Sequence, residues 1–160
     1  MAQYSIKDLE KLSGIKAHTI RIWEQRYGLI VPQRTQTNIR YYDDDQLKFI
    51  LNVSLLSKNG FKISQISGWD HQEFSDKVSS LYEETKIHTG SKHYELGAND
   101  LVGAMIDMDI EKFQRIYESS VRQVGFMETI VGLIYPFLEK VGVLWTIDKI
   151  NPAHEHLISC

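Results

Sequence analysis

The stretch AHTIRIWEQRYG, residues 17–28, has the periodicity of an amphipathic helix. Its apolar side chains at positions 20, 23 and 27 are three and four residues apart, so one face can pack against a core. Gly28 follows the last periodic residue and can end the helix in the left-handed conformation. The remaining faces carry hydrogen-bond donors and two arginines: His18, Arg21, Gln25 and Arg26. The stretch therefore predicts a helix with one buried face and one face available to a polar partner.

A shorter amphipathic segment precedes this helix. Residues 6–12 repeat apolar side chains at helical spacing, and Ser5 is a candidate N-cap with Asp8 three residues later. The turn between the two segments, residues 13–16, is short and contains a glycine. Two helices joined in this way predict a helix-turn-helix, whose second helix enters the major groove of DNA. Lys16 stands at the N-cap position of the second helix, although its side chain is a poor cap.

Residues 29–42 predict a β-hairpin. An extended run at 29–32 and a β-prone run at 39–42 flank the polar, turn-prone segment 33–38. Arg34, Asn38 and Arg40 lie on this hairpin. A hairpin that carries arginines beside a helix-turn-helix predicts a wing against the DNA backbone.

Three consecutive aspartates, residues 43–45, begin the next predicted helix. Asp43 would be the N-cap with Gln46 completing a capping box, and the negative charge suits the positive end of the helix dipole. Three adjacent carboxylates could also bind a metal ion, but a helix cap is the more frequent use of this pattern. We expect the helix to run to Asn59, with Gly60 ending it and one more short helix at residues 61–67.

Charge is unevenly distributed along the chain of 160 residues. Residues 1–64 hold ten Lys and Arg against six Asp and Glu, a balance of +4, whereas residues 65–160 hold eight against fifteen, a balance of −7. A basic N-terminal part suits a nucleic-acid binder whose second part stays away from phosphate. The single cysteine excludes a disulfide framework and a cysteine-rich zinc site. No apolar run has the length of a membrane span, so we expect a cytoplasmic protein.

Residues 4–67 resemble the winged-helix DNA-binding domain of the MerR family of transcriptional regulators. The resemblance rests on YSIKDLEKLSGIKAHTIRIWEQRYGLI at 4–30, NIRYYDDDQLKFI at 38–50 and LLSKNGFKISQI at 55–66, in the family's order and spacing. The variant RIWEQRYG at 21–28 is similar to the branch that contains the cobalamin-dependent photoreceptor repressors of carotenoid synthesis. The resemblance implies double-stranded DNA with a palindromic operator as the partner of a homo-oligomer.

The residues that we expect at the DNA come from the second helix and the wing. For Trp23, packing in the core is an equal alternative to a contact with DNA. The set is Lys16, His18, Thr19, Arg21, Trp23, Arg26, Arg34, Asn38, Arg40 and Tyr41.

The rest of the chain predicts a linker and a helical bundle. We expect a mainly α protein: a winged helix-turn-helix domain at 1–68, a linker helix and joint at 69–92, and an antiparallel four-helix bundle at 93–160. Asn151 would cap the fourth helix, with Pro152 at its first position. Pro136 lies inside the third helix, where it costs about 3 kcal/mol and predicts a kink. The inward stripes of the first three helices are Leu101, Ala104, Met105 and Met108, then Ile110, Phe113, Ile116, Tyr117, Val121 and Val124, then Ile130, Ile134, Phe137, Leu138, Val141 and Leu144.

The predicted fourth helix is short. Cys160 stands roughly two turns into it, fewer residues than a bundle helix needs to cover its neighbours. We therefore expect a partial bundle and a chain that is the N-terminal part of a longer protein.

The bundle resembles the helical cap over cobalamin in those photoreceptor repressors and in cobalamin-dependent methyltransferases. Trp145 is followed, after nine residues, by Glu155 and His156, and the resemblance implies that these three line the upper face of the cofactor. An indole packs on an apolar ligand, while a Glu and a His supply polar contacts in a mostly dry pocket. The competing interpretation is ordinary: a Trp at a helix end is usually core, and a Glu-His pair is usually solvated.

The cobalamin-binding motif DxHxxG of that family is missing from this chain. We therefore expect no cofactor to bind tightly here, with cobalamin possible in a longer protein, and we expect no metal site. The function that the residues favour is a non-enzymatic, nucleoid-associated transcriptional regulator. Two alternatives stay open. One is the cap module of a cobalamin enzyme, which the winged helix argues against, and the other is a regulator whose bundle binds a partner protein or another ligand.

Overall fold

The chain forms two compact units, residues 1–81 and 82–160, in a computed structural model. The structure describes residues 2–85, 91–146 and 152–159. Within these ranges the side chains of residues 82–85, 91–93, 145, 146, 152, 155, 158 and 159 are not described. The predicted fold class is confirmed, since a winged helix-turn-helix is followed by a helical domain.

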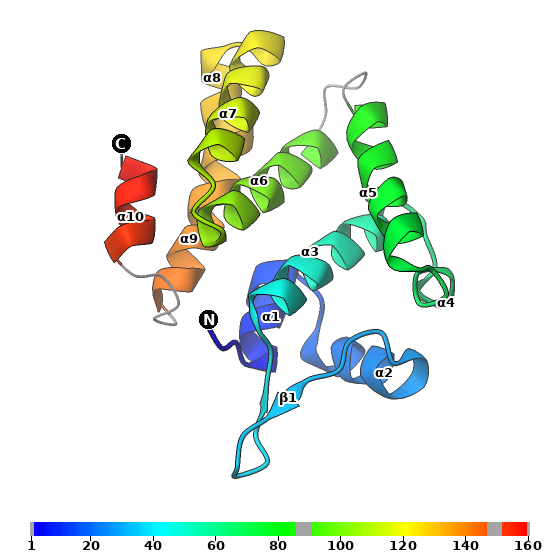
Figure 1. Cartoon of the computed structure of the whole chain (residues 1–160). Helices are drawn as coiled ribbons and strands as arrows, with labels where there is room; N and C mark the ends of the chain where they lie inside the picture. The colour runs from blue at the N-terminus through cyan, green and yellow to red at the C-terminus, as the bar shows by residue number, and fades with distance from the viewer. Residues whose placement is uncertain (1, 86–90, 147–151, 160) are drawn as a thin grey trace. The chain divides into compact units, whose positions relative to one another are not determined.

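Three of the helices in the first unit surround a small core, with a hairpin attached. Helix α1 (Ile6–Ser13) packs against α2 (Ala17–Tyr27) and α3 (Asp44–Lys58), and α2 also contacts the short helix α4 (Ile63–Ile66). Strands β1 (Gln33–Arg34) and β2 (Arg40–Tyr41) pair antiparallel, with Gln33 opposite Tyr41 and Arg34 opposite Arg40. Figure 1 shows this hairpin projecting from the helices of the unit beside α2.

Local side-chain caps begin α1 and α3 as the sequence predicts. Ser5 and Asp8 form a capping box at α1, and Asp43 and Gln46 form another at α3. The two aspartates that follow Asp43 also have protein partners. Asp44 accepts a 2.8 Å hydrogen bond from the Tyr4 hydroxyl, and Asp45 pairs with Lys48 at 3.1 Å. The caps and these contacts account for all three aspartates without a metal ion.

Helix α5 (His71–Thr85) packs on the rest of the first unit through Phe74, and Trp69 just before the helix makes a second aromatic contact. The ring centroids of Phe74 and Phe49 are 4.9 Å apart, and those of Trp69 and Phe61 are 5.4 Å apart in an edge-on arrangement. Leu81 is buried as well, and it is the last residue of this unit. These contacts attach α5, which the sequence predicts as a linker helix, to the first unit.

The second unit is a bundle in which α6 (Ser91–Ile106) has the most neighbours. It packs against α7 (Ile110–Val124), against α9 (Tyr135–Thr146) with the π-helical turn η1 (Ile130–Ile134) before it, and against α10 (Pro152–Ser159). The one-turn helix α8 (Phe126–Thr129) leads into η1 (Figure 1). Asp109 caps α7, and Lys112 of α7 reaches Asp100 of α6 at 3.6 Å. Asn151, the predicted cap of the last helix, lies outside the described residues.

The third bundle helix changes its winding just before Pro136. The Tyr135 N–H donates to the carbonyl of Ile130, five residues earlier, as in a π-helix. Proline has no N–H for the helical ladder and its ring crowds the preceding turn. The wider π turn directly before it is the local irregularity that a proline at this place favours.

Three residues of the predicted inward stripes are exposed. Met108 follows the end of α6 with a positive φ of 55°, and it is 42% exposed. Ile110 and Leu138 are 63% and 41% exposed. In α9, which carries Leu138, other residues of the stripe are buried: Phe137, Val141 and Leu144. Among the described residues, no helix combines the length and the apolar character of a membrane span.

Candidate DNA-binding surface and apolar groove

The outer face of α2 is polar and exposed. His18, Arg21, Gln25 and Arg26 are all exposed, and they lie within two turns of one helix. Arg26 lies 5.5 Å from the centroid of the Tyr27 ring, which positions its guanidinium at the end of the helix. Of the predicted DNA contacts on this helix, Thr19 is half-buried and lies at the edge of the exposed face.

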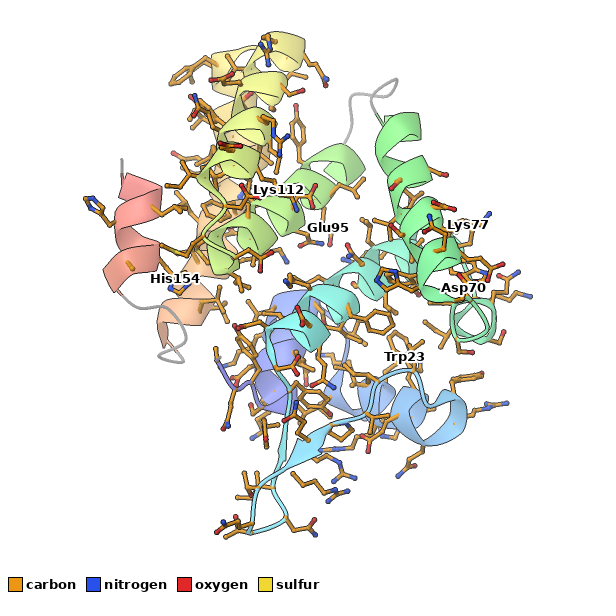
Figure 2. The ribbon with its side chains drawn as sticks, viewed as in Figure 1. Trp23, Asp70, Lys77, Glu95, Lys112 and His154 are labelled. Atoms are coloured by element: carbon orange, nitrogen blue, oxygen red, sulfur yellow. The ribbon has the colours of Figure 1, made fainter. Side chains whose placement is uncertain are left out.

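Trp23 faces the core. Its side chain is 9% exposed and lies on the inner side of α2 (Figure 2), and Ile20 beside it is fully buried. The predicted contact of Trp23 with the groove or phosphates is therefore corrected to core packing, the alternative that its apolar bulk favours. Helical geometry explains the difference, because positions 20, 23 and 27 share the face that packs on the unit.

The N-terminus of α2 is capped by the preceding helix. Glu10 of α1 accepts a 3.0 Å hydrogen bond from the Ala17 N–H and pairs with Lys16 at 3.3 Å. The Ala17 N–H, followed by Lys16, lowers the pKa of Glu10 from its ordinary value. This contact supplies the cap that the Lys16 side chain cannot, and it fixes α2 against α1. Lys16 itself is exposed at the start of the predicted recognition helix.

The wing places Arg34 beside its turn. Residues 35–38 form the turn, in which Asn38 adopts a positive φ of 64° and its N–H donates to the Thr35 carbonyl. The Arg34 Nη1 group donates to the Asn38 Oδ1 at 2.8 Å, and both residues are exposed. Tyr41 is half-buried in β2. The structure thus brings Arg34 and Asn38 together at the exposed tip of the wing.

Arg40 connects the wing to α2. Its Nε lies 3.5 Å from the Glu24 Oε1, and its side chain is 34% exposed. Sequence analysis predicts Arg40 as a contact to phosphate but does not assign Glu24 a role. Gln25 is exposed between Arg21 and Arg26; the sequence places it on the polar face of this helix but outside the predicted set of DNA contacts. Helical spacing would have included it in that set, since residues 18, 21, 22 and 25 follow one another along one helical face.

The second unit carries an apolar groove between α7, the η1–α9 segment and α10. It encloses about 850 Å³ and is lined mainly by aliphatic and aromatic side chains, with His156 and Gln114 as the polar exceptions. Ile110 and Leu138, two residues exposed against expectation, lie in its wall. The other apolar side chains of the lining are Phe113, Tyr117, Ile130, Ile134, Phe137 and Leu157.

His156 is the member of the predicted cofactor set whose side chain the structure describes. It is exposed on α10 and lines the groove. Trp145 lies in the last turn of α9 and Glu155 in α10, but their side chains are outside those described. Within the described part of the chain, no group of three or more His, Cys, Asp or Glu side chains is placed to hold a metal ion.

Two family models match this chain, one in each unit. Residues 4–73 match the MerR HTH family regulatory protein model, and residues 98–159 match the B12 binding domain model. The first match covers the helix-turn-helix, the wing and α3, and the second covers the bundle with its groove. The chain therefore contains a MerR-type helix-turn-helix domain and a helical domain of the B12-binding type.

Three curated relatives are similar to this chain over different shares of its length. The HTH-type transcriptional repressor CarH of Myxococcus xanthus is 23% identical over 156 residues, which is 98% of this chain and 52% of CarH. The repressor CarA of the same organism is 22% identical over 96% of this chain and 48% of its own length. The HTH-type transcriptional regulator MlrA of Escherichia coli is 35% identical over 41% of this chain and 27% of MlrA. This chain spans about half the length of CarH and CarA.

Proposed function

We propose that this MerR-type chain, related to the CarH and CarA repressors, is a transcriptional regulator that binds double-stranded DNA through α2 and the wing. The observation that carries the proposal is the exposed row His18, Arg21 and Gln25 on α2, whose inner face is buried. A helix of this kind fits the major groove, and the wing arginines fit the neighbouring phosphates. Lys16 and Arg26 extend the cationic surface at the two ends of the helix.

Selection from a random duplex library tests this proposal. The full chain is expected to enrich a defined sequence, and its affinity for that sequence is expected to fall as the salt concentration rises, because phosphate contacts release counterions. Arg21→Ala should weaken binding to the selected sequence by roughly tenfold, the usual value of one good base contact. No enriched sequence, or an affinity that does not depend on salt, would overturn the proposal.

A homo-oligomer on a palindromic operator is part of this proposal. Two copies of a helix-turn-helix related by a twofold axis meet two half-sites related by the same symmetry. The selected sequence is therefore expected to be an inverted repeat. Sedimentation of the protein–DNA complex should give two or more chains per duplex, and a single chain on a site without symmetry would contradict this part.

We further propose that the bundle is the upper-face side of a cobalamin site. The groove fits this role because it is mostly apolar, has His156 in its lining, and is formed by the helices that carry Trp145 and Glu155. Cobalamin would supply a reactive cobalt–carbon group at this surface. His156 would offer a polar contact to that group, and the aliphatic walls would exclude water from it.

Absorbance after gel filtration tests the cofactor proposal. Adenosylcobalamin and methylcobalamin are added in the dark or after illumination to this chain and to a version extended beyond residue 160. We expect colour to co-elute with the extended protein and to be reduced by His156→Ala, with little retained by the shorter chain because the DxHxxG motif is missing. Colourless extended protein would overturn the cofactor role.

A second candidate for the bundle is a protein partner or another ligand. The observation that favours it is a row of exposed apolar side chains along α8, η1 and α9, formed by Phe126, Met127, Val131 and Tyr135. These residues do not line the groove. Val131→Ser should leave cobalamin binding unchanged if the groove alone holds the cofactor. A Val131→Ser variant that no longer forms an oligomer on DNA would instead indicate that this row binds a protein partner.

A further inference from the structure

Glu24 lies at the junction of α2 and the wing. Its side chain is 15% exposed, and its Oε1 accepts from the Arg40 Nε at 3.5 Å. The second carboxylate oxygen, Oε2, is buried and has no hydrogen-bond partner among the described residues. A carboxylate that is this buried within the proposed DNA-binding helix is costly, both because it loses water and because it would repel phosphate. Its position in the helix that carries the cationic surface therefore points to a role for Glu24.

A second buried polar group, the hydroxyl of Tyr42, lies near Glu24. Tyr42 is fully buried, and its hydroxyl is also without a hydrogen-bond partner within the described residues. Burial raises the pKa of Tyr42, and the charge of Glu24 raises it further. The Glu24 carboxylate is therefore close enough to affect both Arg40, in β2, and Tyr42, which directly follows β2.

The contact engages Arg40 from the side. Glu24 meets the Nε group, and the Arg40 side chain makes no other hydrogen bond in the described part of the chain. A guanidinium has five N–H donors in a rigid fork, so a contact at Nε leaves the terminal Nη groups to donate elsewhere. The side chain is one third exposed, which gives those groups access to solvent.

We propose that Glu24 is a positioning residue that holds Arg40 by its Nε so that the Nη groups present a fixed fork to a DNA phosphate. Arg34 lies directly opposite Arg40 in the hairpin, so the two guanidinium groups would otherwise repel one another. Glu24 offsets this repulsion and ties β2 to α2, which keeps the wing at a constant distance from the recognition helix. This inference rests on the proposed DNA binding.

The direction in which one substitution changes DNA affinity distinguishes a positioning role of Glu24 from a purely electrostatic one. Glu24→Gln removes a negative charge near the DNA, so electrostatics alone predicts tighter binding. Positioning predicts weaker binding of the selected duplex, by roughly fivefold, because Arg40 loses its ionic partner. Asp45→Asn is the matched control, since Asp45 is an acid of the same unit whose side chain is 78% exposed. It is expected to bind as tightly as the wild type or slightly more tightly.

A double-mutant cycle tests whether Glu24 acts through Arg40. In an Arg40→Gln background, Glu24→Gln should cause no further loss of affinity, because the positioned group is already absent. Additive losses, or a Glu24→Gln variant that binds as well as Asp45→Asn, would overturn the proposal. A wild-type chain that binds no duplex would overturn the proposed function and this inference together, so the two failures are distinguishable.

Arg40→Lys provides a test that leaves Glu24 intact if Glu24→Gln unfolds the unit. Lysine keeps the charge but has no Nε side donor and no fork. If Arg40 is positioned from the side, Arg40→Lys should lose about as much affinity as Arg40→Gln, and the number of ions released on binding should fall by about one in both. Wild-type affinity in Arg40→Lys would show that a point charge suffices and would overturn the role of Glu24.

Discussion

In the first unit the exposed side chains of α2 are mostly polar or cationic, whereas in the second those along α8, η1 and α9 are mostly apolar, with Glu128 and Glu139 as charged exceptions. Both units bury their inner faces equally well: Ile20 in α2 and Leu144 in α9 are fully buried. The two units therefore differ in the side chains that they expose to solvent. A cationic face is well hydrated and attracts phosphate. Exposed apolar side chains, in contrast, lower their free energy when a partner or ligand removes them from water. The first unit is thus equipped to bind a polyanion and the second to bind an apolar partner or ligand.

The largest effect is expected from removing the inner face of α2. Trp23→Ala should destabilise the first unit by about 3–5 kcal/mol, because a buried aromatic side chain and its contacts are lost. Calorimetry should resolve one thermal transition for each unit, and the loss of stability should appear only in the transition of the first unit. Arg21→Ala on the same helix is the control and should stay within about 0.5 kcal/mol of the wild type. Equal losses in the two variants would mean that the outer face of α2 is also part of the core.

The corresponding change in the second unit is Gly132→Ala. A Cβ at Gly132 would lie 2.6 Å from the Cζ of the Tyr94 ring, so this ring, or α6 together with it, would have to move away from η1. We expect a loss of about 1–3 kcal/mol, confined to the second unit. Gly142→Ala in α9 is the control, since its Cβ would meet nothing within 4 Å, and it should gain about 0.5–1 kcal/mol from helix propensity. A Gly132→Ala variant as stable as Gly142→Ala would contradict the close approach of the two helices.

The outer face of the first unit is tested by Arg34→Ala. Arg34 is exposed, and among the described residues its side chain hydrogen-bonds only to Asn38 of the wing, so its loss should barely change stability. We expect DNA affinity to fall similarly for all sequences, and the salt slope to decrease by about one, as for one phosphate contact. Arg122→Ala provides the matched control, because Arg122 is a 73% exposed arginine of the bundle. Loss of affinity for one sequence only would assign Arg34 to a base instead.

The smallest effect concerns the cap of α2. Because the pKa of Glu10 is lowered in the folded chain, its contribution is fully present above its ordinary value of 4.5 and is lost as the pH falls through the lowered value. Glu10→Gln should therefore flatten the decrease in stability of the first unit below pH 4.5. Denaturant unfolding between pH 3 and 6 measures this, at roughly half-unit steps. An unchanged pH profile would show that the hydrogen bond from the Ala17 N–H does not require a charged Glu10 carboxylate.

Residues close together in the chain were predictable from the sequence. Capping boxes and turn glycines involve partners within four residues, so Ser5 with Asp8, Asp43 with Gln46, and Gly28 with its positive φ of 58° are as expected. Periodicity also gave the inner face of α2. The resemblance to the MerR family and to a cobalamin cap came from motif order and agrees with the two matching family models.

Tertiary structure decided the contacts between segments far apart in the chain. Glu10 caps a helix seven residues later, and Glu24 meets an arginine sixteen residues later. No local pattern distinguishes these carboxylates from solvated ones, since their partners are set by how α1, α2 and the hairpin pack. The same holds for Trp23, whose bulk suited core and DNA equally, and for Ile110 and Leu138, which follow the helical period but line a groove. Periodicity gives the face of a helix, but only packing decides whether another helix covers that face.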